Sequence, residues 1–283
     1  MAFSLLMDTS DLKLHLEDPT WAVVDCRFSL DDTERGRRDY RREHIPGAVY
    51  AHLDEDLSGK VIPGKTGRHP LPEIQSFAAT LSAWGIDAGT QVVVYDDATG
   101  TMAARLWWLL QWAGHSNVAV LDGGWLAWTR AGLPVRGGPE SRAPKRFEPS
   151  EVTGAYVTAA QVQEFRIDPR YVLLDARSGP RFRGEVEPID PVAGHIPGAV
   201  SAPCEENVTP EGRFQPPDVL RRRFENLVKS IPPENVICYC GSGVTAAHNI
   251  LAIARAGLGR TRLYAGSWSE WITNAARPIA KDA

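Results

Sequence analysis

This sequence has few cysteines, no long apolar run and no excess of positive charge. Each of these shortages excludes a class of protein. Its 283 residues include only four cysteines at irregular spacing, too few for a disulfide framework. No apolar run approaches the roughly 20 residues that cross a bilayer, and the N-terminal segment is acidic where a targeting signal would be basic. Positive charge is not in excess, because 31 Lys and Arg face 35 Asp and Glu. We therefore expect a cytoplasmic protein with reduced thiols and without nucleic acid or a membrane as a partner.

The cysteine spacing also argues against a metal site. Cys238 and Cys240 form a C-x-C pair, but no second pair follows, as a structural zinc site would need. Hydrophobic residues make up 43% of the chain and charged residues 23%, which is typical of a globular protein with ordinary cores. We expect neither a metal ion nor an organic cofactor.

What the sequence does contain is one ordered set of motifs, present twice. The matching segments, first half against second, are VVDCR at 23–27 with LLDAR at 173–177, HIPGAV at 44–49 with HIPGAV at 195–200, VVVY at 92–95 with VICY at 236–239, and DGGW at 122–125 with AGSW at 265–268. Four landmarks in the same order and at nearly constant offset indicate a tandem duplication.

Short apolar runs alternate with amphipathic segments in each half, which predicts an α/β fold. In the first half we expect strands at 21–25, 49–50, 91–95 and 118–121, and helices at 75–84 and 102–113. Strands separated by helices indicate a mainly parallel sheet with helices on both faces. A segment rich in proline and glycine lies between the halves. We predict an N-terminal domain at 1–138, a linker at 139–154 and a C-terminal domain at 155–283.

Residues 236–257 are the most informative stretch for chemistry. A short apolar strand ends at Cys240, a Gly-Ser-Gly loop follows, and a helix begins near Thr245. This arrangement aims backbone N–H groups and the positive end of a helix dipole at one spot. A cysteine there should be largely thiolate and nucleophilic, although a core cysteine beside a turn fits this pattern equally well. The equivalent residue of the first half is Asp96, which cannot carry sulfur, so we expect one site per chain and an inactive N-terminal domain.

These motifs resemble the two-domain rhodanese family of sulfurtransferases over nearly the whole chain. The resemblance is carried by D-x-R followed by H-I-P-G-A in both halves, C-G-S-G-V-T-A at 240–246 and G-S-W-x-E-W at 266–271. The uncharged loop is similar to the 3-mercaptopyruvate sulfurtransferase type, whereas thiosulfate-preferring members typically have basic residues there. The resemblance implies two rhodanese-like domains and a persulfide carried on Cys240, by ping-pong chemistry.

The resemblance also implies roles for residues outside the nucleophile. Arg181 corresponds to an arginine that binds the carboxylate of the donor, as a planar guanidinium does well. Asp54 and His69 correspond to a pair near the substrate that could relay a proton. The remaining predicted site residues form the loop, where their amides and hydroxyls would face sulfur and donor: Gly241, Ser242, Gly243, Val244 and Thr245.

One departure from the family pattern concerns donor binding. Members of the mercaptopyruvate type usually have a second arginine in an E-P-x-P-R-like stretch before H-I-P-G. Here the stretch 187–191 reads EPIDP and contains no arginine. Arg183 is the candidate substitute that the sequence offers.

We therefore predict a sulfurtransferase that moves sulfur from a small anionic donor, 3-mercaptopyruvate, to cyanide or to a thiol such as thioredoxin or glutathione. Three alternatives remain open at this point. Thiosulfate could be the donor, or the chain could be a regulatory rhodanese-like scaffold with vestigial activity. A Cys-dependent phosphatase would need an arginine six residues after the cysteine, where this chain has Ala246.

Overall fold

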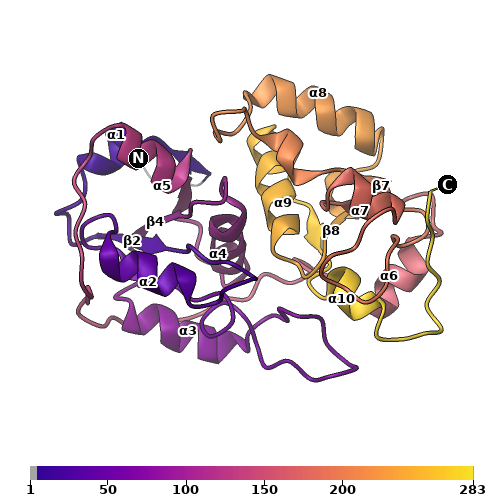
Figure 1. Cartoon of the computed structure of the whole chain (residues 1–283), viewed down its shortest axis with the longest axis horizontal. Coiled ribbons are helices and arrows are strands. Elements are labelled where there is room, and N and C mark those ends of the chain that lie inside the picture. Colours follow the sequence, from indigo (N-terminus) through magenta and orange to yellow (C-terminus); the bar gives the residue numbers. More distant parts are fainter. Residues whose placement is uncertain (1–4, 283) are drawn as a thin grey trace. The chain divides into compact units, whose positions relative to one another are not determined.

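The computed structural model describes residues 5–282, which form two compact units (Figure 1). Unit 1 comprises the chain up to Gly59 together with Leu71–Val152 and Glu211–Arg213. Unit 2 comprises Lys60–Pro70, Thr153–Pro210 and the chain from Phe214 onward. The segment 60–70 therefore belongs to unit 2, although it lies within the range 1–138 for which the sequence predicted one domain. The domain boundaries themselves stay a prediction.

Unit 1 is an α/β unit with a five-stranded parallel sheet in the order β1-β5-β4-β2-β3. Its elements are β1 (Leu6–Met7), α1 (Thr9–Lys13), β2 (Trp21–Asp25), α2 (Arg35–Arg42), β3 (Val49–Tyr50), α3 (Ile74–Ala83), β4 (Gln91–Tyr95), α4 (Thr101–Trp112), β5 (Val118–Leu121) and α5 (Gly124–Arg130). The four predicted strands have the predicted bounds, and the two predicted helices are shifted by one residue. β1 was not predicted, because a strand of two residues is too short to show an alternation of apolar and polar side chains.

Unit 2 repeats this architecture with a four-stranded parallel sheet in the order β7-β6-β8-β9. Its elements are α6 (Ala159–Phe165), β6 (Val172–Asp175), α7 (Gly179–Arg183), β7 (Val200–Ser201), η1 (Cys204–Asn207), α8 (Pro217–Val228), η2 (Pro233–Asn235), β8 (Val236–Tyr239), α9 (Thr245–Arg255), β9 (Arg262–Leu263) and α10 (Ser267–Trp271). Where unit 1 has β1, unit 2 has a single parallel bridge between Tyr156 and Leu263.

The central strands are buried along their whole length. Every residue of β4 and of β8 is buried, as expected for a strand whose sheet is covered on both faces. The predicted α/β class with mainly parallel sheets is confirmed. No helix in the described part of the chain combines the length and apolar character needed to cross a bilayer.

The D-x-R motif has a structural role in unit 1. Arg27 forms a buried ion pair with Asp25, with 2.6 Å between Nη2 and Oδ2, and lies over the ring of Trp125. The hydroxyl of Tyr95 donates to the same carboxylate at 2.7 Å and accepts the N–H of Ile45, in the H-I-P-G segment, at 3.2 Å. One network of contacts therefore links all four repeated motifs of unit 1.

Unit 2 contains the same network. Arg177 pairs with Asp175 at 2.6 Å and lies over the ring of Trp268. Tyr239, at the end of β8, accepts the N–H of Ile196 at 3.2 Å. Because these contacts occur with or without a neighbouring cysteine, they account for the repeated motifs as packing. In unit 2 they also anchor the end of the strand that precedes Cys240.

Candidate active site

Cys240 follows the last residue of β8, at the carboxyl edge of the unit 2 sheet. Parallel α/β sheets bind their ligands at this edge. β8 lies between β6 and β9, so both of its sides are hydrogen-bonded and its end is held firmly. Cys240 is buried, with 2% of its surface exposed. The predicted strand, loop and helix are all present, and α9 begins at Thr245.

The loop after Cys240 directs a peptide dipole at its sulfur. The N–H of Gly243 donates to Cys240 Sγ at 3.1 Å. Gly243 has a φ of 79°, and a Cβ on it would lie 2.3 Å from the carbonyl oxygen of Ala265. A residue with a side chain is therefore excluded here by both backbone conformation and space. The glycine makes the turn tight enough for its N–H to reach the sulfur.

Ser267 holds the backbone of the cysteine by a hydrogen bond. Its Oγ accepts the N–H of Cys240 at 3.1 Å and donates to the carbonyl of Tyr264 at 2.8 Å. Ser267 is fully buried with a φ of 55°, a conformation that residues other than glycine rarely adopt. The equivalent residue in unit 1 is Gly124, with a φ of 52°. Ser267 was not among the predicted site residues, although the sequence has a serine here where the first repeat has glycine.

Two predicted residues, Ser242 and His69, meet in unit 2. Ser242 Oγ and His69 Nδ1 are 2.7 Å apart, and both side chains are buried. His69 reaches the loop because segment 60–70 packs in unit 2. One of the two atoms donates and the other accepts, depending on the tautomer of the imidazole. Their proximity links the cysteine loop to a titratable group.

Two guanidinium groups lie beside Gly241, the residue after the cysteine. A Cβ on Gly241 would lie 2.9 Å from Arg68 Nη2 and 3.6 Å from Arg181 Nη2. Arg181 was predicted, whereas Arg68 was not, although it directly precedes the predicted His69 in the sequence. Arg181 also pairs with Glu187, with 2.6 Å between Nη2 and Oε1.

The remaining predicted residues divide between the units. Val244 is buried and precedes Thr245, the half-buried first residue of α9. Asp54 is exposed in unit 1, where its N–H donates to His52 Nδ1 at 3.2 Å. Because His69 belongs to unit 2, the predicted pairing of Asp54 with His69 stays a prediction.

The other three cysteines lie in environments that favour the neutral thiol. Burial raises the pKa of Cys238 to about 12 and, with the charge of Glu205, that of Cys204 to about 12. Burial also raises the pKa of Cys26 well above its usual range. These thiols are poor nucleophiles near neutral pH.

Asp96 occupies in unit 1 the position that Cys240 has in unit 2. Its carboxylate accepts four backbone N–H groups, from Ala98 at 2.9 Å and Gly100 at 2.8 Å to Oδ1, and from Met102 at 2.8 Å and Ala103 at 2.9 Å to Oδ2. The first repeat has therefore kept the cradle of amides at the start of α4 and filled it with a carboxylate.

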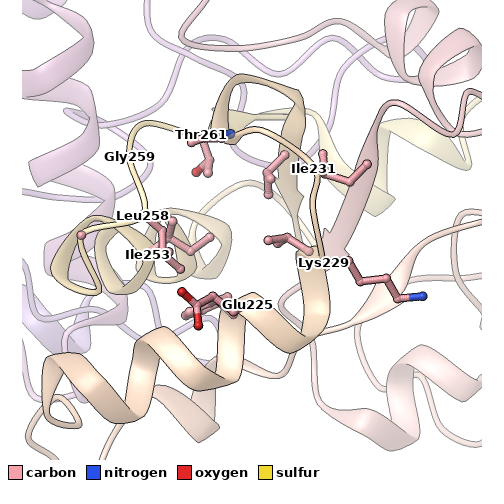
Figure 2. Close-up of a pocket in the computed structure, with 12 residues that line it drawn as sticks. Glu225, Lys229, Ile231, Ile253, Leu258, Gly259 and Thr261 are labelled. Atoms are coloured by element: carbon pink, nitrogen blue, oxygen red, sulfur yellow. The ribbon is translucent and has the colours of Figure 1, made fainter.

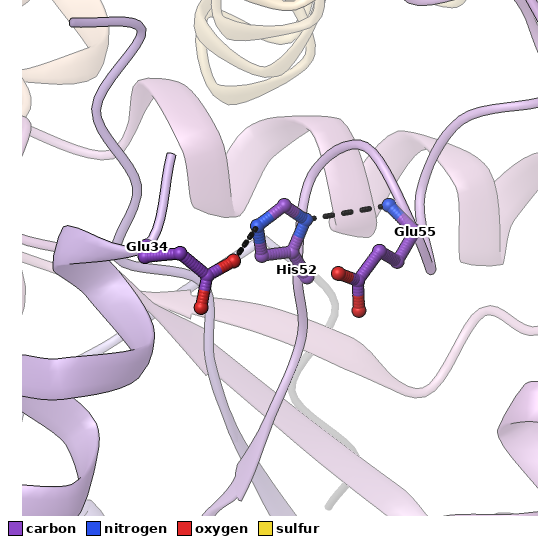
Figure 3. A group of neighbouring side chains, drawn as sticks. All are labelled: Glu34, His52 and Glu55. Carbon is purple, nitrogen blue, oxygen red and sulfur yellow. Dashed lines mark hydrogen bonds and ion pairs between the residues drawn. The ribbon is translucent and has the colours of Figure 1, made fainter. Parts of the chain in front are cut away.

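A second group of titratable side chains, Glu34, His52 and Glu55, lies close together in unit 1 (Figure 3). Both nitrogens of the imidazole are engaged. Nδ1 accepts the N–H of Glu55 at 3.3 Å, and Nε2 faces the carbonyl of Thr33 at 3.1 Å. Arg37 pairs with both glutamates, at 3.3 Å and 2.5 Å, which supplies the positive charge that a cation would. This group is a structural network rather than a set of metal ligands.

Unit 2 contains a cavity of about 520 Å³, shown in Figure 2. Its lining includes Glu225 from α8, Ile253 from α9 and Val236, the first residue of β8. Cys240 follows the opposite end of the same strand. None of the predicted site residues lines this cavity.

The family model for a rhodanese-like domain matches residues 8–131 and again residues 158–274. This chain belongs to the rhodanese-like family. The predicted family and the duplication of its domain are thereby confirmed, and the phosphatase alternative is not supported.

Rhodanese-like relatives cover nearly the whole chain. A probable 3-mercaptopyruvate sulfurtransferase of Pseudomonas aeruginosa is 49% identical over 281 residues, 99% of each chain. A putative thiosulfate sulfurtransferase of Mycobacterium tuberculosis is 38% identical, covering 93% of this chain and 92% of that one. The structure is similar to that of the 3-mercaptopyruvate sulfurtransferase from Leishmania major, with a TM-score of 0.85, 32% identity and coverage of 98% of this chain and 76% of that one. The prediction of a sulfurtransferase, an enzyme acting between a sulfur donor and an acceptor, is confirmed.

Proposed function

We propose that this chain is a 3-mercaptopyruvate sulfurtransferase in which Cys240 carries the sulfur. The observation that carries the proposal is the position of the sulfur: Cys240 Sγ accepts the N–H of Gly243 at 3.1 Å, at the start of α9, with guanidinium groups beside the adjoining residue. Peptide dipoles and a helix N-terminus stabilise a thiolate and, after transfer, a persulfide anion.

In the first half-reaction, the Cys240 thiolate attacks the thiol sulfur of 3-mercaptopyruvate. The S–S bond forms as the C–S bond of the donor breaks, and the electron pair of that bond leaves with pyruvate enolate. A proton then converts the enolate to pyruvate. His69 and Ser242 form the pair that we assign to proton movement at this step, with Asp54 as its proposed partner.

In the second half-reaction, an acceptor thiolate or cyanide attacks the outer sulfur of the persulfide. The S–S bond breaks, the Cys240 thiolate is released, and the product is a new persulfide or thiocyanate. Thioredoxin and glutathione are the proposed thiol acceptors. The loop amides from Gly241 to Thr245, that of Val244 included, would stabilise the negative charge on sulfur in both half-reactions.

The choice of donor follows from the charge around the loop. The loop itself is uncharged, and the arginines beside it are opposed by buried carboxylates, Glu187 and Asp190. Such a site has little net positive charge and suits a monoanion with one carboxylate better than the thiosulfate dianion. The relatives from Pseudomonas aeruginosa and Leishmania major carry the same donor in their names.

The test is to treat the purified protein with each donor separately and to compare kcat/KM with cyanide as acceptor. We expect 3-mercaptopyruvate to be preferred and intact-protein mass spectrometry to show a gain of one sulfur atom, absent in Cys240→Ser. A clear preference for thiosulfate would overturn the choice of donor. A protein that gains no sulfur from either donor would support the scaffold alternative instead.

A further inference from the structure

The stretch 187–191 lacks the arginine that the family pattern places there, and Arg183 does not replace it. Arg183 pairs with Glu185, with 2.7 Å between Nε and Oε1 and 3.0 Å between Nη2 and Oε2, and none of its nitrogens is among the atoms nearest to the place of a Cβ on Gly241. Its side chain is 44% exposed at the end of α7. Arg183, the candidate substitute for the missing arginine, therefore belongs to an ion pair at the protein surface.

Arg68 occupies a different position, beside the nucleophile. Its Nη2 lies 2.9 Å from the place that a Cβ on Gly241 would take, closer than either terminal nitrogen of Arg181, at 3.6 and 3.8 Å. Both guanidinium groups thus lie beside the residue that follows Cys240. A side chain at position 241 would fill the space next to them, and glycine leaves it open.

Asp190 joins the two arginines. Its Oδ1 pairs with Arg68 Nη1 and its Oδ2 lies 3.3 Å from Arg181 Nη2, while only 3% of its side chain is exposed. Asp190 stands in the stretch where the family pattern has arginine. A carboxylate at that place, between two guanidinium groups, is the arrangement expected if the positive charge has moved to another segment of the chain.

The backbone of Arg68 is held in place on unit 2. Its N–H donates to Ser269 Oγ at 3.1 Å, and the N–H of Ser269 donates to the carbonyl of Gly241 at 2.9 Å. Gly67 packs against the carbonyl of Gly266, where a Cβ would lie at 2.5 Å. The hydrogen bond of the Arg68 side chain uses Nη1, so Nη2, the nitrogen beside Gly241, has no hydrogen-bond partner among the described residues. The side chain is 28% exposed. Nη2 is therefore a donor that a bound anion could use.

We propose that Arg68 is the second cation of the donor site: with Arg181 it binds the carboxylate of a small 2-oxo acid donor beside Cys240, and Asp190 holds the two arginines together. This inference rests on the proposed function for the identity of the donor. The anion-binding role of Arg68 is independent of that identity and can be measured without turnover.

The test compares Arg68→Ala and Arg68→Lys with the matched control Arg183→Ala, which removes an arginine paired at the surface. Each is alkylated with iodoacetate and with the neutral iodoacetamide, and the rate at Cys240 is followed by peptide mass spectrometry. Iodoacetate carries a carboxylate and needs no sulfur transfer, so the ratio of the two rates reports the anion site alone. We expect Arg68→Ala to lower the ratio about tenfold or more and Arg68→Lys to lower it less, because a lysine keeps the charge without the fork.

Steady-state kinetics give the second measurement. With 3-mercaptopyruvate and cyanide, Arg68→Ala should lower kcat/KM about 10- to 100-fold, chiefly through KM, while Arg183→Ala stays within about twofold. An unchanged alkylation ratio in a folded Arg68→Ala or Arg68→Lys protein would overturn the proposal. A lowered ratio in a protein that does not turn over 3-mercaptopyruvate would support the anion site and reject the donor instead.

Discussion

His69 Nδ1 lies 2.7 Å from Ser242 Oγ, and the contact joins residues that are far apart in the sequence. The histidine lies in segment 60–70 of unit 2, and the serine lies two residues after the nucleophile. Both side chains are buried, so the hydrogen bond is shielded from water and holds the hydroxyl in one orientation. The geometry makes the two side chains one hydrogen-bonded pair.

Ser242→Ala and His69→Ala should therefore each lower kcat/KM for 3-mercaptopyruvate, by about 10- to 100-fold. The double variant should be little worse than either single one, because each substitution already breaks the pair. Steady-state kinetics on all four proteins measure the coupling, and urea unfolding checks that each is folded. Effects of the two substitutions that simply multiply would show that the residues act separately.

Ser267 offers a pair of substitutions that separates a hydrogen bond from backbone strain. Ser267→Ala leaves the N–H of Cys240 without its acceptor and should cost about 1 to 3 kcal/mol of unfolding free energy. Ser267→Gly loses the same bond but suits the φ of 55°, and should regain about 1 kcal/mol. Urea unfolding should rank wild type first, Ser267→Gly second and Ser267→Ala third. A glycine variant less stable than the alanine variant contradicts this account.

Asp96→Asn should destabilise the chain by about 2 to 4 kcal/mol. One carboxylate oxygen is replaced by an NH2 group, which would face the two backbone N–H groups that this oxygen accepted and leave both without an acceptor. The matched control is the neighbouring Asp97→Asn, which removes a partly exposed ion pair with Arg35 and should cost less than about 1 kcal/mol. Denaturant unfolding measures both. Equal costs would mean that the amide cradle of unit 1 contributes nothing specific to stability.

The burial of His115 should make the unfolding free energy of the chain depend on pH. Burial lowers the pKa of His115, so the unfolded chain takes up a proton near pH 6.5 that the native chain does not. The unfolding free energy should therefore fall as the pH drops from 7.5 through 6.5 toward the lower native pKa. His115→Gln should flatten this part of the profile, as measured by urea unfolding at several pH values. A variant with the wild-type slope would exclude His115 as its source.

The fold was predictable where the signal was local. The apolar runs at 91–95 and 236–239 and the glycine loop after Cys240 specify their own conformation, and all three were correctly placed. The contacts of Arg68 and of Ser267 were not predictable, because each depends on a segment brought alongside from elsewhere in the chain. Ser267 adopts a φ that its own side chain disfavours, and the sequence signal for it is the glycine at the matching position of the first repeat.

The presence of Lys60–Pro70 in unit 2 has a consequence for anyone who wishes to divide the molecule. A protein engineer who cut the chain in the predicted linker and kept the later half would retain Cys240, Arg181 and Ser242 but discard Arg68 and His69, the partners that we assign to anion binding and proton movement. A fragment meant to contain all of unit 2 would therefore have to include Lys60–Pro70, although Leu71–Val152 of unit 1 lies between that segment and the rest of unit 2.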